Sequence, residues 1–316
     1  MLSLSRMRIS LLLAVTLLGI QSAMVAASHP VVDVAYAGSL VTMMERFLGP
    51  AFAKSGYEFR GEGKGSVALG RLIGDGLRNP DIFISADTAV LDDLRAGPEA
   101  PVKWYLPFAS ARLVIGYSPK SRFARSLREA ALRRRTIVTV LEQAGLRIGR
   151  TDPAIDPKGY RTVIAVRLAQ QYYHEPDLQK KVLGDQNNPA QIFPEEQLLV
   201  RLESGDLDAA FLYSTESAAR RIPTIELPAP INLGDVRLAR RYARVVVRVG
   251  EKVRVGTPIV YALTIPQRAS NRQGAVAFLR FFFSTTGKRI GEHSGLQFIR
   301  APFVGDRTAV PQALSF

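Results

Sequence analysis

Short apolar runs alternate with amphipathic stretches along most of the chain. Residues 31–37 (VVDVAYA) alternate as a strand. The spacing of three and four residues that follows predicts a helix with Ser39 as its N-cap and with one apolar face made of Leu40, Met43, Met44, Phe47 and Leu48. A helix headed by Ser66 and a buried strand at residues 80–85 continue this order. Strands that alternate with helices are typical of a parallel sheet covered on both faces, so we expect an α/β fold.

Two strongly β-type stretches divide this pattern. Residues 112–117 (RLVIGY) and 257–265 (TPIVYALTI) each follow an irregular segment, and we interpret them as two hinge strands that join two lobes. Each lobe would have a mostly parallel sheet flanked by helices. Lobe one would comprise residues 28–112 together with 262–316, and lobe two would comprise residues 113–261.

Lobe two contains two clear helix starts. Asp156 followed by Pro157 is a typical N-cap and first-turn pair, and it predicts that the backbone N–H of Lys158 points out of the helix end. A second helix is expected to start at residues 194–196 (PEE) and to stop at Gly205, and a strand that ends at Tyr213 follows it. The ends of these elements are therefore candidate binding positions.

The stretch from Gly61 to Ser66, GEGKGS, resembles a phosphate-binding loop but lacks its spacing. Glu58 stands where the first glycine of such a loop would fall, and Gly65 separates Lys64 from Ser66. A glycine-rich turn before a helix still presents backbone N–H groups and a partial positive charge to an anion. We interpret the stretch as an oxyanion-binding turn; the alternative is a surface turn in which Ser66 only caps a helix.

The first 27 residues have the order of a secretory signal peptide. Arg6 and Arg8 precede an apolar run, and small residues up to Ala27 follow it, which places cleavage near Ala27. The apolar run is shorter than a full membrane span, and a retained anchor is the alternative. The chain contains no cysteine, which excludes a disulfide, a catalytic thiol and a lipid-modified cysteine. We expect a mature protein that is free in the periplasm.

The chain is strongly basic and otherwise of ordinary globular composition. It has 316 residues, 47% of them hydrophobic, and a formal net charge of +14, which attracts anions of any kind. The densest basic run, Arg133–Arg135, predicts a solvated helix face, because it lacks the interleaved aromatic residues typical of nucleic-acid binding. The three histidines lie far apart, which argues against a histidine metal site. We therefore expect a small anion as the ligand and no nucleic-acid partner.

Five short stretches occur in a characteristic order: Ala37–Leu40 (AGSL), Gly65–Ala68 (GSVA), Asp81–Asp87 (DIFISAD), Asp156–Arg161 (DPKGYR) and Thr257–Tyr261 (TPIVY). Together they resemble the periplasmic molybdate/tungstate-binding proteins of ABC importers, most closely the tungstate-binding branch. Each stretch is unspecific alone, but the likeness runs in register from about residue 31 to residue 303. The resemblance implies a type II periplasmic binding protein, whose two lobes close on a tetrahedral dianion and deliver it to a permease in the inner membrane.

The resemblance also implies which residues bind the oxyanion. Ser39 and Ser66 of lobe one would offer hydroxyl and backbone N–H groups. The backbone N–H groups of Lys158 and Glu195 and the hydroxyl of Tyr213 would bind from lobe two. Neutral donors of this kind compensate a buried dianion without a paired cation, and they favour fully deprotonated oxyanions over protonated phosphate.

In the tungstate-binding branch, two carboxylates can join the metal and make it six-coordinate. Asp156 matches one of them, whereas Leu212 stands at the other position and Glu216 is the nearest replacement. Our hypothesis is that Asp156 and Glu216 bind molybdenum or tungsten directly. The alternatives are a simple N-cap for Asp156 and a solvated loop for Glu216.

Other functions stay open on the sequence alone. The first alternative is the same fold binding sulfate, phosphate or another small anion; the second is a secreted enzyme that acts on an anionic substrate. The sequence offers oxyanion donors but no credible pair of nucleophile and base, and the G-x-S-x-G motif is absent. A basic surface adhesin would rest on charge alone. We expect a monomeric binding protein, not an enzyme, that needs no cofactor and takes molybdate or tungstate as its ligand.

Overall fold

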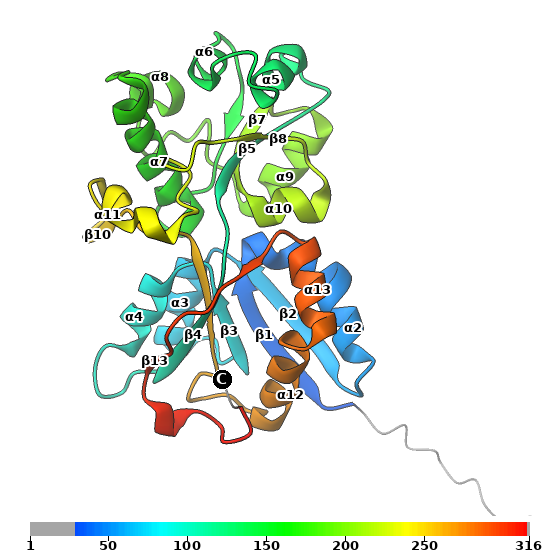
Figure 1. Cartoon of the computed structure of the whole chain (residues 1–316). Coiled ribbons are helices and arrows are strands. Elements are labelled where there is room, and N and C mark those ends of the chain that lie inside the picture. Colours follow the sequence, from blue (N-terminus) through cyan, green and yellow to red (C-terminus); the bar gives the residue numbers. More distant parts are fainter. Residues whose placement is uncertain (1–28, 315–316) are drawn as a thin grey trace, which may run out of the picture.

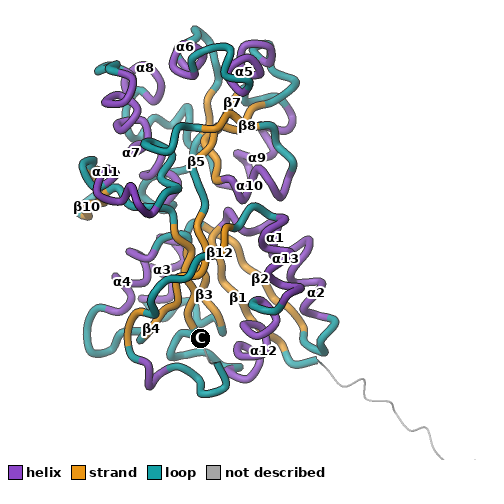
Figure 2. Tube along the Cα trace, in the orientation of Figure 1, coloured by secondary structure: helices purple, strands orange, loops and turns teal. Residues whose placement is uncertain are grey.

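The computed structural model describes residues 29–314, which form two lobes connected by two chain segments (Figure 1). Each lobe has a central sheet with helices packed around it (Figure 2). The two-lobe α/β fold expected from the sequence is confirmed. The expected signal peptide lies outside the described residues. None of the helices in the described part of the chain combines the length and the apolar character needed to span a bilayer.

Lobe one is built on a seven-stranded sheet with the order β12-β4-β11-β3-β1-β2, in which β13 also pairs with β4. Its strands are β1 (Val31–Ala37), β2 (Glu58–Lys64), β3 (Ile82–Ser85), β4 (Trp104–Ser110), β11 (Val260–Thr264), β12 (Gln297–Phe298) and β13 (Val304–Gly305). β1 is parallel to β2 and β3, whereas β11 is antiparallel to both β3 and β4. The sheet is therefore mixed rather than mostly parallel, because β11 enters it on the way back from lobe two.

Helices cover the lobe-one sheet and seal an apolar, phenylalanine-rich core. They are η1 (Gly38–Leu40), α1 (Val41–Met43), η2 (Met44–Leu48), α2 (Gly49–Ala53), α3 (Ser66–Gly74), α4 (Thr88–Arg95), α12 (Arg272–Phe282), α13 (Thr285–His293) and η4 (Arg307–Ala309). Phe52 of α2 meets Phe278 of α12 edge to face, with ring centroids 5.1 Å apart. The C-terminal helices thus pack back on lobe one, as the pattern of apolar residues predicted.

Lobe two is built on a four-stranded sheet with the order β6-β7-β5-β8. Its strands are β5 (Leu113–Tyr117), β6 (Ile148–Gly149), β7 (Ala209–Tyr213) and β8 (Thr224–Glu226), and β9 (Val246–Val249) and β10 (Lys252–Val255) form a separate hairpin. The helices are α5 (Ala124–Ala131), α6 (Ile137–Leu141), α7 (Pro157–Tyr173), α8 (Leu178–Leu183), α9 (Glu195–Ser204), α10 (Ser214–Arg220), η3 (Val236–Leu238) and α11 (Ala239–Tyr242). β6 is parallel to β7, but β5 is antiparallel to β7 and β8, so the expectation of a mostly parallel sheet is wrong for lobe two as well.

Two chain segments pass between the lobes. Residues 111–112 connect β4 with β5, and residues 227–259 lead from β8 past the β9–β10 hairpin to β11. Val260 and Tyr261 already pair with β4 in the lobe-one sheet. The division of the chain at residues 112/113 and 261/262 stays a prediction, but the two stretches singled out as hinge strands are β5 and the segment that contains β11.

The first helical segment departs from its predicted geometry. Ser39 lies inside a 3₁₀ turn rather than at an N-cap, since Ala37 holds the cap position and no side chain caps the turn. Residues Met44–Leu48 then form a π-helical turn, in which the backbone hydrogen bonds join residues five apart instead of four. This wider turn rotates Phe47, predicted to be buried, toward solvent, where it is 46% exposed.

The glycine-rich stretch GEGKGS is mostly strand rather than turn. Gly61 to Lys64 belong to β2, which pairs in parallel with β1. A Cβ atom at Gly63 would lie 2.2 Å from the Val41 side chain, and one at Gly61 would lie 2.5 Å from the Tyr36 hydroxyl oxygen. The glycines thus let large neighbours pack against the strand, and the expectation of a glycine-rich turn at this place is wrong.

Candidate functional site

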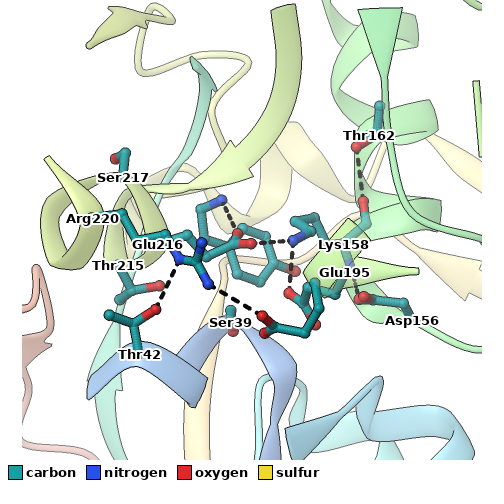
Figure 3. Close-up of polar contacts among 12 residues, drawn as sticks. Ser39, Thr42, Asp156, Lys158, Thr162, Glu195, Thr215, Glu216, Ser217 and Arg220 are labelled. Atoms are coloured by element: carbon teal, nitrogen blue, oxygen red, sulfur yellow. Dashed lines mark hydrogen bonds and ion pairs between the residues drawn. The ribbon is translucent and has the colours of Figure 1, made fainter. Parts of the chain in front are cut away.

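The two lobes touch along the cleft between them. The backbone N–H of Ala68 in α3 donates to the Ile155 carbonyl at 3.2 Å, and the Arg220 guanidinium of α10 donates to the Thr42 hydroxyl at 3.0 Å. At the other side of the cleft, the ammonium group of Lys252 in β10 lies 2.7 Å from the Asp93 carboxylate. Lys158, Glu195 and Glu216, from the first turns of α7, α9 and α10, lie close to Ser39, which follows β1 (Figure 3).

Asp156 begins helix α7 in the way that its sequence predicts. Its carboxylate accepts the backbone N–H of Lys158 at 2.7 Å, and Pro157 occupies the first helical position. The N–H of Lys158 is therefore already bonded in this structure and does not point freely out of the helix end. Burial, together with the charge of Glu195, raises the pKa of Asp156 to about 7.

The side chain of Lys158 is the centre of the site. It is fully buried, and its ammonium group lies 2.7 Å from the carboxylate of Glu195 and 2.5 Å from that of Glu216 (Figure 3). Burial alone would lower the pKa of Lys158, but the neighbouring carboxylates outweigh burial and hold the pKa above its ordinary value. The sequence analysis singled out only the backbone N–H of Lys158, so this buried ammonium group is a charged feature of the site that it did not anticipate.

Glu195 lies in the first turn of α9, directly after Pro194. Its side chain is 9% exposed and reaches the backbone of Gly38 in lobe one. The approach is so close that a Cβ atom added to Gly38 would lie 1.7 Å from a Glu195 carboxylate oxygen. Glycine at position 38 is thus what makes room for this carboxylate beside Ser39. Burial and the nearby Glu216 raise the pKa of Glu195 to about 7, although Lys158 opposes the shift.

Glu216 is buried in α10 and is not part of a solvated loop. One of its carboxylate oxygens accepts the backbone N–H of Tyr213 at 2.7 Å, and the other accepts from Lys158. This closes a capping box at the start of the helix. Leu212, in contrast, is buried in a small apolar cluster with Leu198 and Leu202, whereas Tyr213 belongs to the main core.

The two serines singled out in lobe one are both buried, and each is hydrogen-bonded. The Ser39 hydroxyl lies 2.8 Å from the hydroxyl of Tyr261 in β11, which also lies 3.0 Å from the hydroxyl of Thr215 in α10. The Ser66 hydroxyl accepts the backbone N–H of Ala86 at 3.1 Å. Both serines lie at the junction of the lobes. Tyr261 links Ser39 to Thr215 of lobe two, and Gly65, next to Ser66, abuts the Ile155 carbonyl of lobe two.

A second buried ion pair, which the sequence analysis did not single out, joins the lobes beside the site. Arg161 of α7 lies 3.2 Å from the carboxylate of Asp87 in lobe one and donates to the hydroxyl of Tyr213 at 3.1 Å. The Tyr160 hydroxyl donates to Asp87 as well. The Asp87 carboxylate also caps α4 by accepting the N–H of Ala89.

A cavity of about 330 Å³ lies next to Glu195 between the lobes. It is lined by Gly38, Gly63, Lys64, Gly65, Ala68, Thr151, Asp152, Ile155, Asp156, Ile192, Phe193, Pro194, Glu195 and Glu196. The glycines of lobe one and the first turn of α9 thus form opposite walls. The stretch GEGKGS therefore reaches the cleft with its last residues, although most of it is strand.

The structure brings the seven predicted site residues to the junction of the lobes: Ser39, Ser66, Asp156, Lys158, Glu195, Tyr213 and Glu216. Sequence reasoning missed Arg161, Asp87, Tyr160, Thr215 and Tyr261 as parts of the same network. All of these except Thr215 lie inside the short stretches that carry the family resemblance, and this position in the sequence could have indicated a role in the site. Within residues 29–314, no group of three or more side chains is arranged to hold a free metal ion.

The chain is similar in sequence to known solute-binding proteins. Residues 32–297 match the family model described as bacterial extracellular solute-binding protein. An uncharacterized solute-binding protein of Petrotoga mobilis is 36% identical over 260 residues, which cover 80% of this chain and 78% of that protein. A Haloferax volcanii protein, provisionally named an ABC transporter molybdenum-binding protein, is 38% identical over 239 residues, covering 74% of this chain and 72% of that protein.

Two further comparisons concern proteins named for their ligand. The molybdate/tungstate-binding protein WtpA of Pyrococcus abyssi is 29% identical over 265 residues, covering 77% of this chain and 76% of that protein. The solved structure of the periplasmic molybdate-binding protein of Azotobacter vinelandii superposes with a TM-score of 0.58 at 18% identity, covering 86% of this chain and 100% of that one. At this identity the superposition shows the shared fold alone.

Proposed function

The chain belongs to the bacterial extracellular solute-binding protein family, and we propose that it binds molybdate or tungstate in the cleft between its lobes for delivery to an ABC importer. Relatives named for molybdenum, molybdate or tungstate binding support this choice of ligand. The observation that carries the proposal is the convergence of buried donors from both lobes at one place. Ser39 and Ser66 approach from lobe one, and Lys158 and Tyr213 approach from lobe two.

The first turn of α9 adds a further feature that suits an anion. Pro194 offers no side-chain cap, so the N–H groups at the start of this helix, including that of Glu195, have no side-chain acceptor. Such N–H groups and the helix dipole favour a negative charge at this end. Together with the serine and tyrosine hydroxyls, they provide donors that replace the hydration shell of a dianion.

Direct bonding of the metal by carboxylates is the finer part of the proposal. Asp156 and Glu216 lie on either side of Lys158, and each already holds a backbone N–H group. Six-coordination of molybdenum or tungsten requires two carboxylate oxygens in addition to the four oxygens of the oxyanion, so one oxygen each of Asp156 and Glu216 would have to face the metal while both caps are kept. Each carboxylate has lone pairs to spare for this, since it offers about four acceptor positions.

The proposed setting follows from the family. We propose a monomer in the periplasm, released from its signal peptide, that presents the closed lobes to an inner-membrane permease. Catalysis is not part of the proposal, because the relatives are solute-binding proteins and the site holds hydroxyls without an adjacent histidine base. The buried tyrosines and serines of the cleft have the roles of fixed donors.

Isothermal titration calorimetry of the mature protein tests the proposal. Tungstate, molybdate, sulfate and phosphate are titrated in turn at one pH and one ionic strength. Tight binding of one tungstate or molybdate per chain, with no heat from sulfate or phosphate, is the expected result. Preferential binding of sulfate or phosphate would instead establish the alternative ligand, and heat from none of the four would remove the oxyanion function.

A further inference from the structure

The ammonium group of Lys158 is enclosed by protein and placed where both lobes meet. Its side chain has no solvent exposure, and its two carboxylate partners come from different helices, Glu195 from α9 and Glu216 from α10. A buried cation of this kind is stable only with a paired anion. Which anion it pairs with is therefore the central electrostatic question of the site.

The two carboxylate partners are held very differently. Glu216 is anchored by its capping box, because it also accepts the backbone N–H of Tyr213 at 2.7 Å. Within the described residues, the hydrogen bonds of the Glu195 carboxylate run only to side chains. Glu195 can therefore leave Lys158 by rotating its own side chain, whereas Glu216 cannot leave without uncapping α10.

Glu195 also occupies the place that an incoming anion needs. Its carboxylate reaches across the cleft to the backbone of Gly38, which directly precedes Ser39. The Glu195 carboxylate thus connects the Lys158 ammonium group of lobe two with the Gly38–Leu40 turn of lobe one, and the proposed oxyanion would make the same connection. The adjoining cavity of about 330 Å³, lined by Glu195 itself, has room for the displaced side chain.

The charge balance points the same way. Asp156, Glu195 and Glu216 surround one ammonium group, so the ionised cluster has an excess of negative charge that opposes a dianion. Displacing the Glu195 carboxylate from Lys158 reduces this excess at the ammonium group.

We propose that the ammonium group of Lys158 binds the oxyanion directly and that Glu195 is an internal competitor, which holds Lys158 until the oxyanion displaces it. This inference rests on the proposed function and adds a cation to its neutral donors. It makes Lys158 the residue that selects for a doubly charged ligand. It makes the Glu195 side chain the residue that lowers affinity, although its backbone N–H still serves as a donor.

Calorimetry on three variants tests the inference. Glu195→Gln keeps the size of the side chain but removes the competing charge, and we expect it to bind tungstate about 5- to 10-fold more tightly than the parent protein. Lys158→Met removes the cation, and we expect binding about 10- to 100-fold weaker. Glu203→Gln is the matched control: it removes the same charge from an exposed position of the same helix and should change affinity less than about twofold.

Perrhenate supplies a readout that a purely structural role of Lys158 would not affect. It is tetrahedral like tungstate but carries one negative charge, so Lys158→Met should weaken tungstate binding by a larger factor than perrhenate binding. If Lys158→Met fails to fold, Glu195→Gln decides alone. Unchanged or weaker tungstate binding by Glu195→Gln, with the parent protein binding normally, overturns the inference and leaves the proposed function intact. A parent protein that binds no oxyanion overturns both.

Discussion

The hydroxyl of Ser39 lies 2.8 Å from the hydroxyl of Tyr261, and the same tyrosine hydroxyl lies 3.0 Å from that of Thr215. Ser39 follows β1 in lobe one, and Thr215 belongs to α10 of lobe two. Tyr261 itself lies on β11, the strand through which the chain returns to lobe one. One buried hydroxyl thus links the candidate oxyanion donor of lobe one with the opposite wall of the cleft.

Replacing Tyr261 by Phe should therefore weaken tungstate binding by about 0.5–1.5 kcal/mol, since Ser39 loses the partner that orients its hydroxyl. Calorimetric titration measures the change. Tyr105→Phe is the control, because Tyr105 is a buried tyrosine of lobe one whose hydroxyl bonds Asp92 away from the cleft. Equal losses of affinity in the two variants would show that Tyr261 has no special part in the site.

Replacing Ser66 by Ala should weaken binding by about 1–3 kcal/mol, the cost of leaving a buried charged acceptor one partner short. The hydroxyl also accepts the N–H of Ala86, so a loss of thermal stability without ligand is expected in addition. The two effects are separated by thermal unfolding with and without tungstate. An unchanged affinity would remove Ser66 from the site.

The Asp87 pair with Arg161 should contribute far more to stability than the Asp93 pair with Lys252, although both join helix α4 to lobe two. Asp87 is buried with its partner, whereas Asp93 is 44% exposed. Asp87→Asn leaves a buried guanidinium without its counter-ion and should cost about 3–5 kcal/mol. Asp93→Asn should cost at most about 1 kcal/mol. Urea unfolding of the two variants without ligand measures both values, and similar losses would contradict this account.

The stability of the protein without ligand should fall as the pH rises from about 5.5 to 8. The pKa values of Asp156 and Glu195 are raised to about 7 from ordinary values of 3.8 and 4.5, so the folded chain keeps protons that the unfolded chain has already released. The stabilisation is therefore full below the ordinary pKa values and is lost as the pH passes 7.

Thermal unfolding across this pH range measures the effect. Glu195→Gln removes one of the two titrating groups, so its unfolding temperature should depend less steeply on pH than that of the parent protein. Glu203→Gln, which alters an exposed carboxylate, should keep the slope of the parent. A parent protein whose unfolding temperature rises over this range would contradict the assignment.

The sequence predicted the fold well because its signals are local. The N-cap at Asp156, the helix stop at Gly205 and the strand ending in Tyr213 depend on neighbouring residues, and the structure shows each of them. The helix after Ser39 was less predictable. A π-helical turn does not follow the spacing of three and four residues, so Phe47 was assigned to the wrong face.

The chemistry of the site was harder to predict, because it depends on contacts between distant residues. Lys158 and Glu216 are 58 residues apart, and their pairing arises only when α7 and α10 converge. A lysine within two residues of a helix start is ordinarily solvated, so nothing local indicated a fully buried ammonium group. The glycines of GEGKGS show the converse: their local pattern indicated a turn, whereas their role is to admit Tyr36 and Val41 against a strand.

The most direct test of the central claim is an anomalous difference map, at the tungsten absorption edge, of crystals grown with tungstate. The account predicts one strong peak per chain between the Ser39 and Ser66 backbones and the first turns of α7 and α9, within bonding distance of the Lys158 ammonium through a tungstate oxygen. A peak only at the protein surface, or none at all, would contradict it.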